Sequence, residues 1–365
     1  MRVLLWHVHG GWMDAFVQGG HDYLLPATPA GGPWGLGRGG RDWPPNAVEV
    51  APQELRAADV DVVVLQRPEE LGVAERLLGG HLGRDIPAVY LEHNTPRRQV
   101  PDTVHPMAGR GIPLVHVTRF NALVWDNRDA PVRVIDHGVP DPGYRYTGER
   151  ARLASCANEG VRRRRVLGTD LLLDFAAAGP VDVFGIGADE VPQALGATAA
   201  RLPLASGGDL PPARLREALA TRRAYVHPAR WTSLGLSLIE AMMLGMPALV
   251  LATTQAAESI PPEAGAVSLD VPRLVASARR YLDDPDRARR DGLAARTAAL
   301  ERFPLDRFLR AWDEALDDAV GRVRRRERRA GTAARTSSTI STTGPASTTG
   351  TTGTASTITT TRGTT

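Results

Sequence analysis

Glu240 is the acidic residue whose setting in the sequence points most directly to chemistry. The apolar residues around it recur at helical spacing: Leu238, Ile239, Met242 and Met243. A carboxylate in such a setting needs partners, because burying it unpaired costs several kcal/mol. The residues alone leave two explanations open. Either a neighbouring Arg or a helix N-terminus satisfies the carboxylate, or a bound polar ligand does.

The elements on both sides of Glu240 form a strand, loop, helix and strand in succession. The sequence predicts a short strand at 225–228, a loop at 233–236 that runs into the helix, and the next buried strand at 248–251. Gly245 ends the helix. Such a unit puts backbone N–H groups and a helix N-terminus at the carboxyl edge of a parallel sheet, where anions bind well. An ordinary strand-to-helix turn is the alternative for the loop.

This stretch resembles the nucleotide-binding signature of retaining glycosyltransferases with the GT-B fold, those of the group 1 or family 4 type. In that signature two Glu residues stand eight positions apart, and Ala-Met and a Gly-x-Pro turn follow the second. Glu240 matches the second Glu, and the matching flank is Ala241, Met242, Gly245, Met246 and Pro247. Thr232 stands where the family has the first Glu. The resemblance therefore implies a nucleotide-sugar site that is changed near the donor sugar.

The resemblance also assigns roles within residues 232–240. It implies that Glu240 accepts hydrogen bonds from the ribose diol of the donor, and that Thr232 holds a catalytic position near the donor sugar. Because a hydroxyl is a weaker acceptor than a carboxylate, altered donor choice or lost activity could follow. We expect the loop to offer backbone N–H groups to a diphosphate or to sugar hydroxyls; its residues are Ser233, Leu234, Gly235 and Leu236.

Two strand ends in the first half of the chain provide further candidates. Gly10 and Gly11 follow the first predicted strand without completing G-x-G-x-x-G, so a dinucleotide site is unsupported. The resemblance implies a Gly-rich loop beside the donor phosphates and the acceptor, and a plain turn is the alternative. His93 follows another predicted strand. A lone His is more often a structural hydrogen bonder, but this strand end should face the cleft, and the resemblance implies contact with the donor sugar.

Four consecutive arginines, 162–165, precede a Gly-Thr-Asp-Leu-Leu segment. Such like-charge runs are usually solvated surface. The resemblance implies basic residues here that hold the donor diphosphate, and Arg163 and Arg165 are our candidates. A leaving diphosphate must be neutralised by cations or by a metal. Because no Asp-x-Asp motif stands in a suitable loop, we expect no cofactor and a metal-independent reaction with a UDP- or GDP-linked donor.

Apolar runs separated by helical patterns predict parallel strands covered on both faces. The runs lie at 2–8, 60–65, 88–91, 114–118, 132–135, 181–185, 225–227, 248–251 and 267–269. Residues 20–45, rich in Gly, Pro and Trp, read as an irregular loop. The expected fold is α/β, with two Rossmann-like domains facing a cleft, the GT-B fold.

The expected domain boundaries follow from these patterns and the resemblance. Residues 1–137 form an N-terminal acceptor domain and residues 138–304 a C-terminal nucleotide-sugar-binding domain. Residues 305–330 form a terminal helix that packs back toward the first domain. Residues 331–365 are almost entirely Ser, Thr, Gly and Ala, which cannot bury a core, so we expect a disordered tail.

Composition narrows the class of protein. All 44 basic residues are Arg, which is typical of a GC-rich genome, and the net charge of +3 is weak support for nucleic acid binding. One cysteine excludes a disulfide framework within the chain. The short apolar N-terminus and the lack of an eighteen-residue apolar run predict a cytoplasmic protein. The basic segment 322–329 either contacts anionic lipid at the inner membrane face or is a solvated helix end.

The resemblance implies transfer of a glycosyl group from a nucleotide-sugar donor to an acceptor, with retention of configuration. The acceptor could be a glycan, a lipid-linked molecule or a small molecule, and no nucleic acid partner is expected. Two alternatives stay open. A sugar-nucleotide epimerase can share the fold and would release UDP and an epimerised sugar without an acceptor. A non-catalytic nucleotide-sugar-binding protein would bind without turnover.

Overall fold

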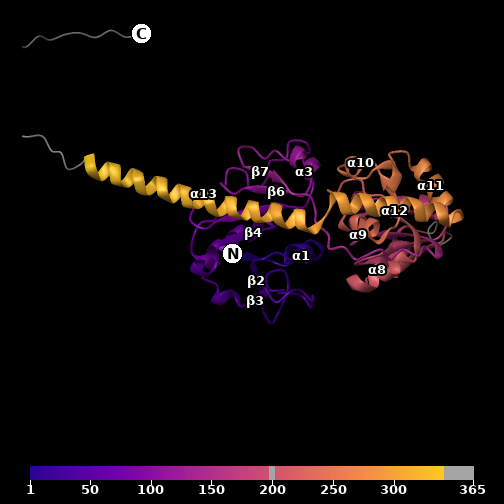
Figure 1. Cartoon of the computed structure of the whole chain (residues 1–365), viewed down its shortest axis with the longest axis horizontal. Helices are drawn as coiled ribbons and strands as arrows, with labels where there is room; N and C mark the ends of the chain where they lie inside the picture. The colour runs from indigo at the N-terminus through magenta and orange to yellow at the C-terminus, as the bar shows by residue number, and fades with distance from the viewer. Residues whose placement is uncertain (197–201, 341–365) are drawn as a thin grey trace, which may run out of the picture. The chain divides into compact units, whose positions relative to one another are not determined.

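The computed structural model describes residues 1–196 and 202–340. Within these residues the strands form two parallel sheets, one of seven strands and one of six (Figure 1). The first sheet has the order β3-β2-β1-β4-β5-β6-β7. Its strands are β1 (Arg2–Leu5), β2 (Asp22–Pro26), β3 (Ala47–Val50), β4 (Val62–Leu65), β5 (Ala88–Glu92), β6 (Leu114–His116) and β7 (Val132–Val134).

Helices cover both faces of the first sheet, whose central strands β4 and β5 are buried along their whole length. The helices formed by this part of the chain are α1 (Gly10–Phe16), α2 (Pro68–Leu78) and α3 (Arg119–Val124), with short 3-10 turns at Pro52–Glu54 and Ala57–Asp59. Alternate residues of β1 and β4 enter two different hydrophobic clusters, one on each face. Burial on both faces explains the continuous apolar runs in the sequence.

The second sheet has the order β10-β9-β8-β11-β12-β13. Its strands are β8 (Arg150–Cys156), β9 (Val181–Phe184), β10 (Leu204–Gly208), β11 (Arg222–His227), β12 (Ala248–Leu251) and β13 (Gly265–Ser268). All neighbouring strands pair in parallel. The carboxyl ends of these strands therefore meet at one edge of the sheet, as in other open α/β sheets.

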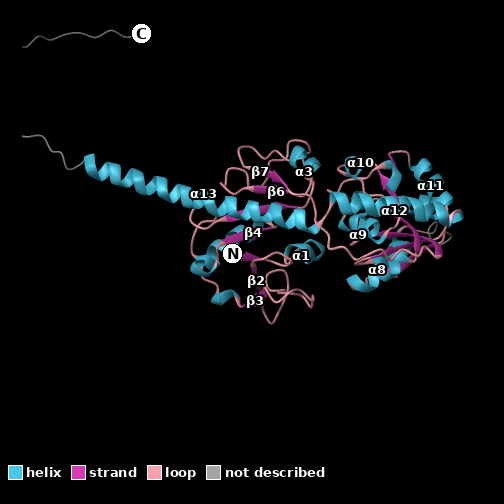
Figure 2. Cartoon of the chain, in the orientation of Figure 1, coloured by secondary structure: helices cyan, strands magenta, loops and turns pink. Residues whose placement is uncertain are grey.

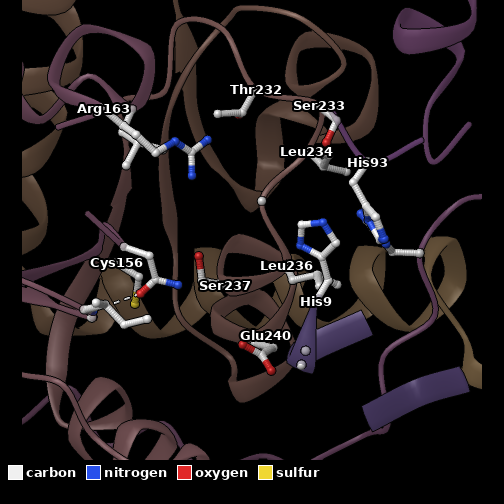
Figure 3. Close-up of a pocket in the computed structure, with 18 of the residues that line it drawn as sticks. His9, His93, Cys156, Arg163, Thr232, Ser233, Leu234, Leu236, Ser237 and Glu240 are labelled. Atoms are coloured by element: carbon white, nitrogen blue, oxygen red, sulfur yellow. Dashed lines mark hydrogen bonds between the residues drawn. The ribbon is translucent and has the colours of Figure 1, made fainter. Parts of the chain in front are cut away.

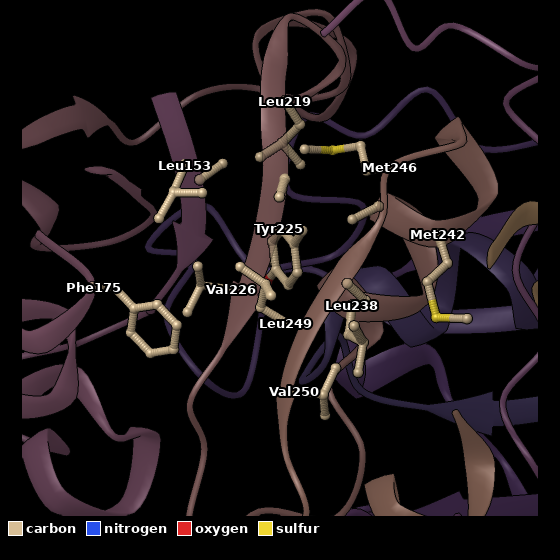
Figure 4. Close-up of a cluster of buried hydrophobic side chains, with 14 of the residues drawn as sticks. Leu153, Phe175, Leu219, Tyr225, Val226, Leu238, Met242, Met246, Leu249 and Val250 are labelled. Carbon is tan, nitrogen blue, oxygen red and sulfur yellow. The ribbon is translucent and has the colours of Figure 1, made fainter. Parts of the chain in front are cut away.

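The helices of this second half pack along its sheet (Figure 2). They are α4 (Arg164–Leu167), α5 (Leu172–Ala176), α6 (Val191–Ala194), α8 (Pro212–Ala220), α9 (Leu236–Leu244), α10 (Ala256–Ser259), α11 (Val271–Asp283) and α12 (Pro285–Arg302), with 3-10 turns at Thr169–Leu171, Ala188–Glu190 and Pro262–Ala264. Tyr225, Leu238 and Met242 lie in the core between the sheet and α9 (Figure 4). The helix α9 is thereby fixed by its apolar residues, and Glu240 is its charged residue.

Helix α13 (Leu305–Ile340) begins against the core of the first half. The Trp312 ring lies 5.4 Å from that of Trp12 and 5.0 Å from that of Phe16, in edge contacts. The helix corrects one prediction, because it continues to Ile340, into the segment expected to be disordered from 331. Extending an existing helix is easier than starting one, which favours continuation into this segment. The rest of the predicted tail, 341–365, lies outside the described residues.

Two other predictions of secondary structure were wrong or incomplete. The segment 20–45, expected to be irregular, contains β2, and β3 follows directly after it. Strands β8 and β10 were not predicted. The β8 segment alternates Arg and Ala before its apolar half, and the β10 segment ends in two glycines, which are poor strand formers. Pairing with neighbouring strands, rather than local preference, makes them strands.

Candidate functional site

A cavity of about 890 Å³ lies between the loops at the carboxyl ends of the strands of both sheets. The loops after β1 and β5 contribute from the first sheet, and those after β8, β9, β10 and β11 contribute from the second. Figure 3 shows Arg163 and Glu240 directed into one space that His9 and Ser237 also border. Most of the predicted site residues line it: Gly10, Gly11, His93, Arg163, Thr232, Ser233, Leu234, Gly235, Leu236 and Glu240.

The Glu240 carboxylate reaches this cavity from the middle of α9 and is only partly exposed. Among the described residues, none forms a hydrogen bond or an ion pair with this carboxylate. A neighbouring Arg therefore does not satisfy it. Burial raises the pKa of Glu240 to about 7, although the nearby Arg216 opposes this. A carboxylate held in this way gains from a ligand that donates hydrogen bonds to it.

The first turn of α9 supplies donors beside Glu240. Gly235 is the N-cap, has extended backbone angles and forms no side-chain cap, and the backbone N–H groups of Leu236 and Ser237 find no acceptor among the described residues. A Cβ atom at Gly235 would lie 2.6 Å from Cε1 of His227, so only glycine allows this loop to pass the imidazole. The loop thus presents unpaired N–H groups, which suit an anion or sugar hydroxyls.

Arg163 provides a positive charge on the opposite wall. It is the N-cap of α4, lines the cavity and has no ion-pair partner in residues 1–196 and 202–340. Burial lowers its pKa, and the neighbouring Arg97 lowers it further. The prediction for Arg165 was wrong: this residue does not line the cavity, and its exposed side chain pairs with Asp170 at 3.4 Å. Being two positions further on in a helical turn directs it elsewhere.

His93 lies in the cavity wall with two other imidazoles. Its ring centroid is 3.9 Å from that of His9 and 6.4 Å from that of His137. Burial lowers the pKa of His93 well below its usual value, and burial likewise lowers the pKa values of His9 and His137 to about 4. All three rings are therefore neutral near pH 7. His93 can exchange hydrogen bonds with a ligand, and it adds no positive charge.

Thr232 lines the cavity, and its hydroxyl forms no hydrogen bond within the described part of the chain. The residue before it, Trp231, connects the two domains, because its indole N–H donates to the Pro96 carbonyl at 2.7 Å. Gly11 lies across from α9, since a Cβ there would be 3.3 Å from Cδ1 of Leu236. The Gly-rich loop and the Thr232 loop thus face each other over the cavity.

Sequence reasoning missed several residues that line the cavity. His9 directly precedes Gly10, and Arg97 stands four positions after His93, where a strand-end pattern could have found it. The Asp14 carboxylate accepts from Arg41 and from the Trp43 indole, both at 2.7 Å. Arg216 lies on α8, far from any motif. Only the fold brings the charges of Arg216, Asp14 and Arg41 close to Glu240.

The residues that the structure describes contain no cluster of three or more His, Cys, Asp and Glu side chains that could hold a metal ion. Metal independence stays a prediction. Nor does any helix among the described residues combine the length and apolar character needed to cross a lipid bilayer.

The family described as Glycosyl transferases group 1 matches residues 207–297, a span that includes α9 and Glu240. No curated protein matches the sequence significantly.

Solved structures resemble much more of the chain. HepE from Anabaena, in complex with UDP-glucose, has a TM-score of 0.66 at 14% identity over 87% of this chain and 100% of its own. Sucrose-phosphate synthase from Thermosynechococcus elongatus has a TM-score of 0.63 at 15% identity over 87% and 98%. A mutant of TarM from S. aureus, in complex with UDP and two other ligands, has a TM-score of 0.56 at 12% identity over 70% of this chain. The chain spans 55% of the length of TarM.

The fold is therefore that of the GT-B glycosyltransferases, and the predicted fold class is confirmed. Two parallel-sheet α/β domains border a single cavity, and the family match covers the part of the second domain that contains Glu240. At these identities the structural likeness defines architecture, and the chemistry has to be argued from the cavity itself.

Proposed function

We propose that this protein is a glycosyltransferase that moves a sugar from a nucleotide-sugar donor to an acceptor with retention of configuration. The observation that supports this most is Glu240, a carboxylate without a partner among the described residues, next to the unpaired N–H groups of Leu236 and Ser237 and across the cavity from Arg163. The carboxylate can accept hydrogen bonds from a ribose diol, and the N–H groups and the guanidinium can bind a diphosphate.

In this proposal each part of the cavity has one task. Glu240 accepts the ribose hydroxyls, and Arg163 with the first turn of α9 neutralises the diphosphate. His93 contacts the donor sugar, and Thr232 lies near it. The bond between the anomeric carbon and the diphosphate oxygen breaks with the electron pair left on oxygen. The acceptor hydroxyl forms the new bond, and its proton passes to the departing diphosphate or to water.

The donor is proposed to be UDP- or GDP-linked, and the reaction to need no metal or cofactor. Gly10 and Gly11 would lie beside the donor phosphates, next to an acceptor that is a glycan, a lipid-linked molecule or a small molecule. The proposed location is the cytoplasm, with the basic segment 322–329 as the candidate for peripheral membrane contact. None of the charges described above suggests a nucleic acid partner.

The experiment is a turnover assay with UDP-, GDP- and ADP-sugars, in which release of the nucleoside diphosphate is followed with and without EDTA. We expect slow hydrolysis of one donor by the wild type, unaffected by EDTA, and a loss of roughly a hundredfold in Glu240→Gln. An epimerase would instead release the nucleoside diphosphate together with an epimerised sugar. No turnover of any donor, and no binding of any, would contradict the proposal.

A second function is favoured by Thr232, whose hydroxyl replaces the carboxylate of the resembling family. A protein that binds a nucleotide sugar without turnover would give tight donor binding in the absence of product. Introducing the carboxylate by Thr232→Glu distinguishes the two. If the protein is a binding protein that lost activity together with the carboxylate, Thr232→Glu should gain turnover. If it is an enzyme adapted to threonine, Thr232→Glu should lose turnover.

A further inference from the structure

Arg97 and Arg163 bring guanidinium groups into the cavity from opposite domains. Arg97 lies in the loop after β5 of the first domain, and Arg163 caps α4 of the second. Neither forms an ion pair within the described residues; the contact made by Arg97 is a hydrogen bond of 3.5 Å to Oδ1 of Asn94. Two cations that approach without a counter-ion repel each other, so an anion bound between them would be favoured.

Contacts with Trp231 hold the loop that ends in Arg97. The Thr95 hydroxyl donates to the Trp231 carbonyl at 3.3 Å, and the Trp231 indole N–H donates to the carbonyl of Pro96 at 2.7 Å. The Trp231 ring also makes an edge contact with Phe120 at 5.5 Å. Residues 95 and 96 are thus fixed on the second domain, and Arg97 is the next residue along the chain.

The acidic group that interacts with both cations, Glu159, leaves them without an ion pair. The hydrogen bonds from Arg162 lower the pKa of Glu159 most, and the charges of Arg163 and Arg97 lower it further. Both carboxylate oxygens of Glu159 already accept hydrogen bonds from Arg162. Arg97 is also the neighbouring charge that acts most strongly on Arg163. The positive charge between the domains is therefore available to a ligand.

We propose that Arg97 is a catalytic cation supplied by the first domain, which holds the donor diphosphate jointly with Arg163 of the second. This inference rests on the proposed function. When the bond to the sugar breaks, the nucleoside diphosphate gains one negative charge, and a second guanidinium stabilises that charge more than it stabilises the intact donor. Full neutralisation of the leaving group then requires both domains, which couples catalysis to closure of the cleft.

The test measures binding of UDP, GDP and ADP, and of the matching monophosphates, by calorimetry. The variants are Arg97→Gln, Arg163→Gln and the control Arg98→Gln, which removes an exposed arginine next in sequence that does not line the cavity. We expect Arg97→Gln to weaken binding of the diphosphate roughly tenfold or more, and binding of the monophosphate much less. The same variant should reduce turnover by a larger factor than it reduces binding. Arg98→Gln should match the wild type.

Two results would overturn the inference while leaving the proposed function intact. One is wild-type affinity of Arg97→Gln for the diphosphate that the protein binds. The other is an equal loss for monophosphate and diphosphate, which would indicate general attraction rather than a diphosphate contact. If none of the three diphosphates binds the wild type, the proposed function itself fails, and the inference fails with it.

Discussion

The side-chain oxygen of Gln66 lies 3.2 Å from Nε2 of His93. The orientation of this amide is fixed, because its NH₂ group donates to the Trp6 carbonyl at 2.9 Å. The backbone N–H of Gln66 is held in turn by the buried carboxylate of Glu70 at 2.6 Å. Since the amide oxygen only accepts, Nε2 of His93 must carry the hydrogen, and Nδ1 is left as an acceptor.

We predict that His93 is the Nε2–H tautomer in the ligand-free protein. A long-range proton–nitrogen NMR spectrum of histidine-labelled protein at pH 7 reports this directly. Gln66→Leu removes the acceptor and should produce a mixture of tautomers, while Gln53→Leu, at an exposed position, should leave the spectrum unchanged. A His93 ring protonated on Nδ1 in the wild type would contradict the assignment.

Donor binding should strengthen with pH, because burial raises the pKa of Glu240 to about 7 and only the ionised carboxylate accepts both diol hydrogen bonds. His9 stays neutral in this range, since burial lowers its pKa to about 4. The affinity of the wild type, divided by that of Glu240→Gln, should therefore rise about tenfold between pH 6 and pH 8. The ratio cancels the titration of the ligand phosphate. A ratio that does not change with pH would argue against an ionised Glu240 in the complex.

Folding stability should fall as the pH drops below 6.5. Burial lowers the pKa values of His9, His116, His137 and His227 to about 4, so the unfolded chain binds protons that the folded chain does not. The loss is about 1.4 kcal/mol per pH unit for each such histidine between its two pKa values. Thermal unfolding at pH 7, 6 and 5 measures this loss of stability. A Tm that stays constant or rises as the pH falls would contradict the prediction.

Glu240 provides an internal check on that acid profile. Its pKa is higher in the folded protein than in the unfolded chain, so the folded state binds more protons between pH 4.5 and 7 and gains stability as the pH falls. This opposes the histidines. Glu240→Gln should therefore lose stability more steeply than the wild type from pH 7 to pH 5, and a shallower loss would be inconsistent with the buried setting of Glu240.

Gly168 and Gly79 form a matched pair for backbone strain. Both have a φ of +70°, but a Cβ at Gly168 would lie 1.8 Å from the Pro228 carbonyl oxygen, whereas one at Gly79 would meet nothing within 4 Å. Gly79→Ala should cost about 1 kcal/mol, the price of the left-handed conformation alone. Gly168→Ala should cost several times as much, because α4 and the strand end must separate. Equal losses of unfolding free energy in chemical denaturation would mean that the loop moves to accommodate the added methyl group and would contradict this prediction.

The sequence predicted the elements whose residues are buried on every side. Strand β12 is a continuous apolar segment and helix α9 is mostly apolar, and the Gly-x-Pro turn marks where the helix leads to the strand. Strand β10 could not be predicted, because its Ser and Gly residues become a strand only through pairing with β9. Glu240 and Arg163 were found by motif and by charge. Arg97, Asp14 and Arg216 reach the same cavity from unrelated segments, and no local pattern connects them.

The central claim is that Glu240 holds the donor nucleotide, and a thermal-shift panel tests it most directly. UDP-, GDP- and ADP-sugars are added to the wild type, to Glu240→Ala and to the control Glu263→Ala, which changes an exposed residue outside the cavity. We predict that one nucleotide raises the Tm of the wild type and the control, and that Glu240→Ala loses most of that shift. Equal shifts in all three proteins would contradict the assignment of Glu240.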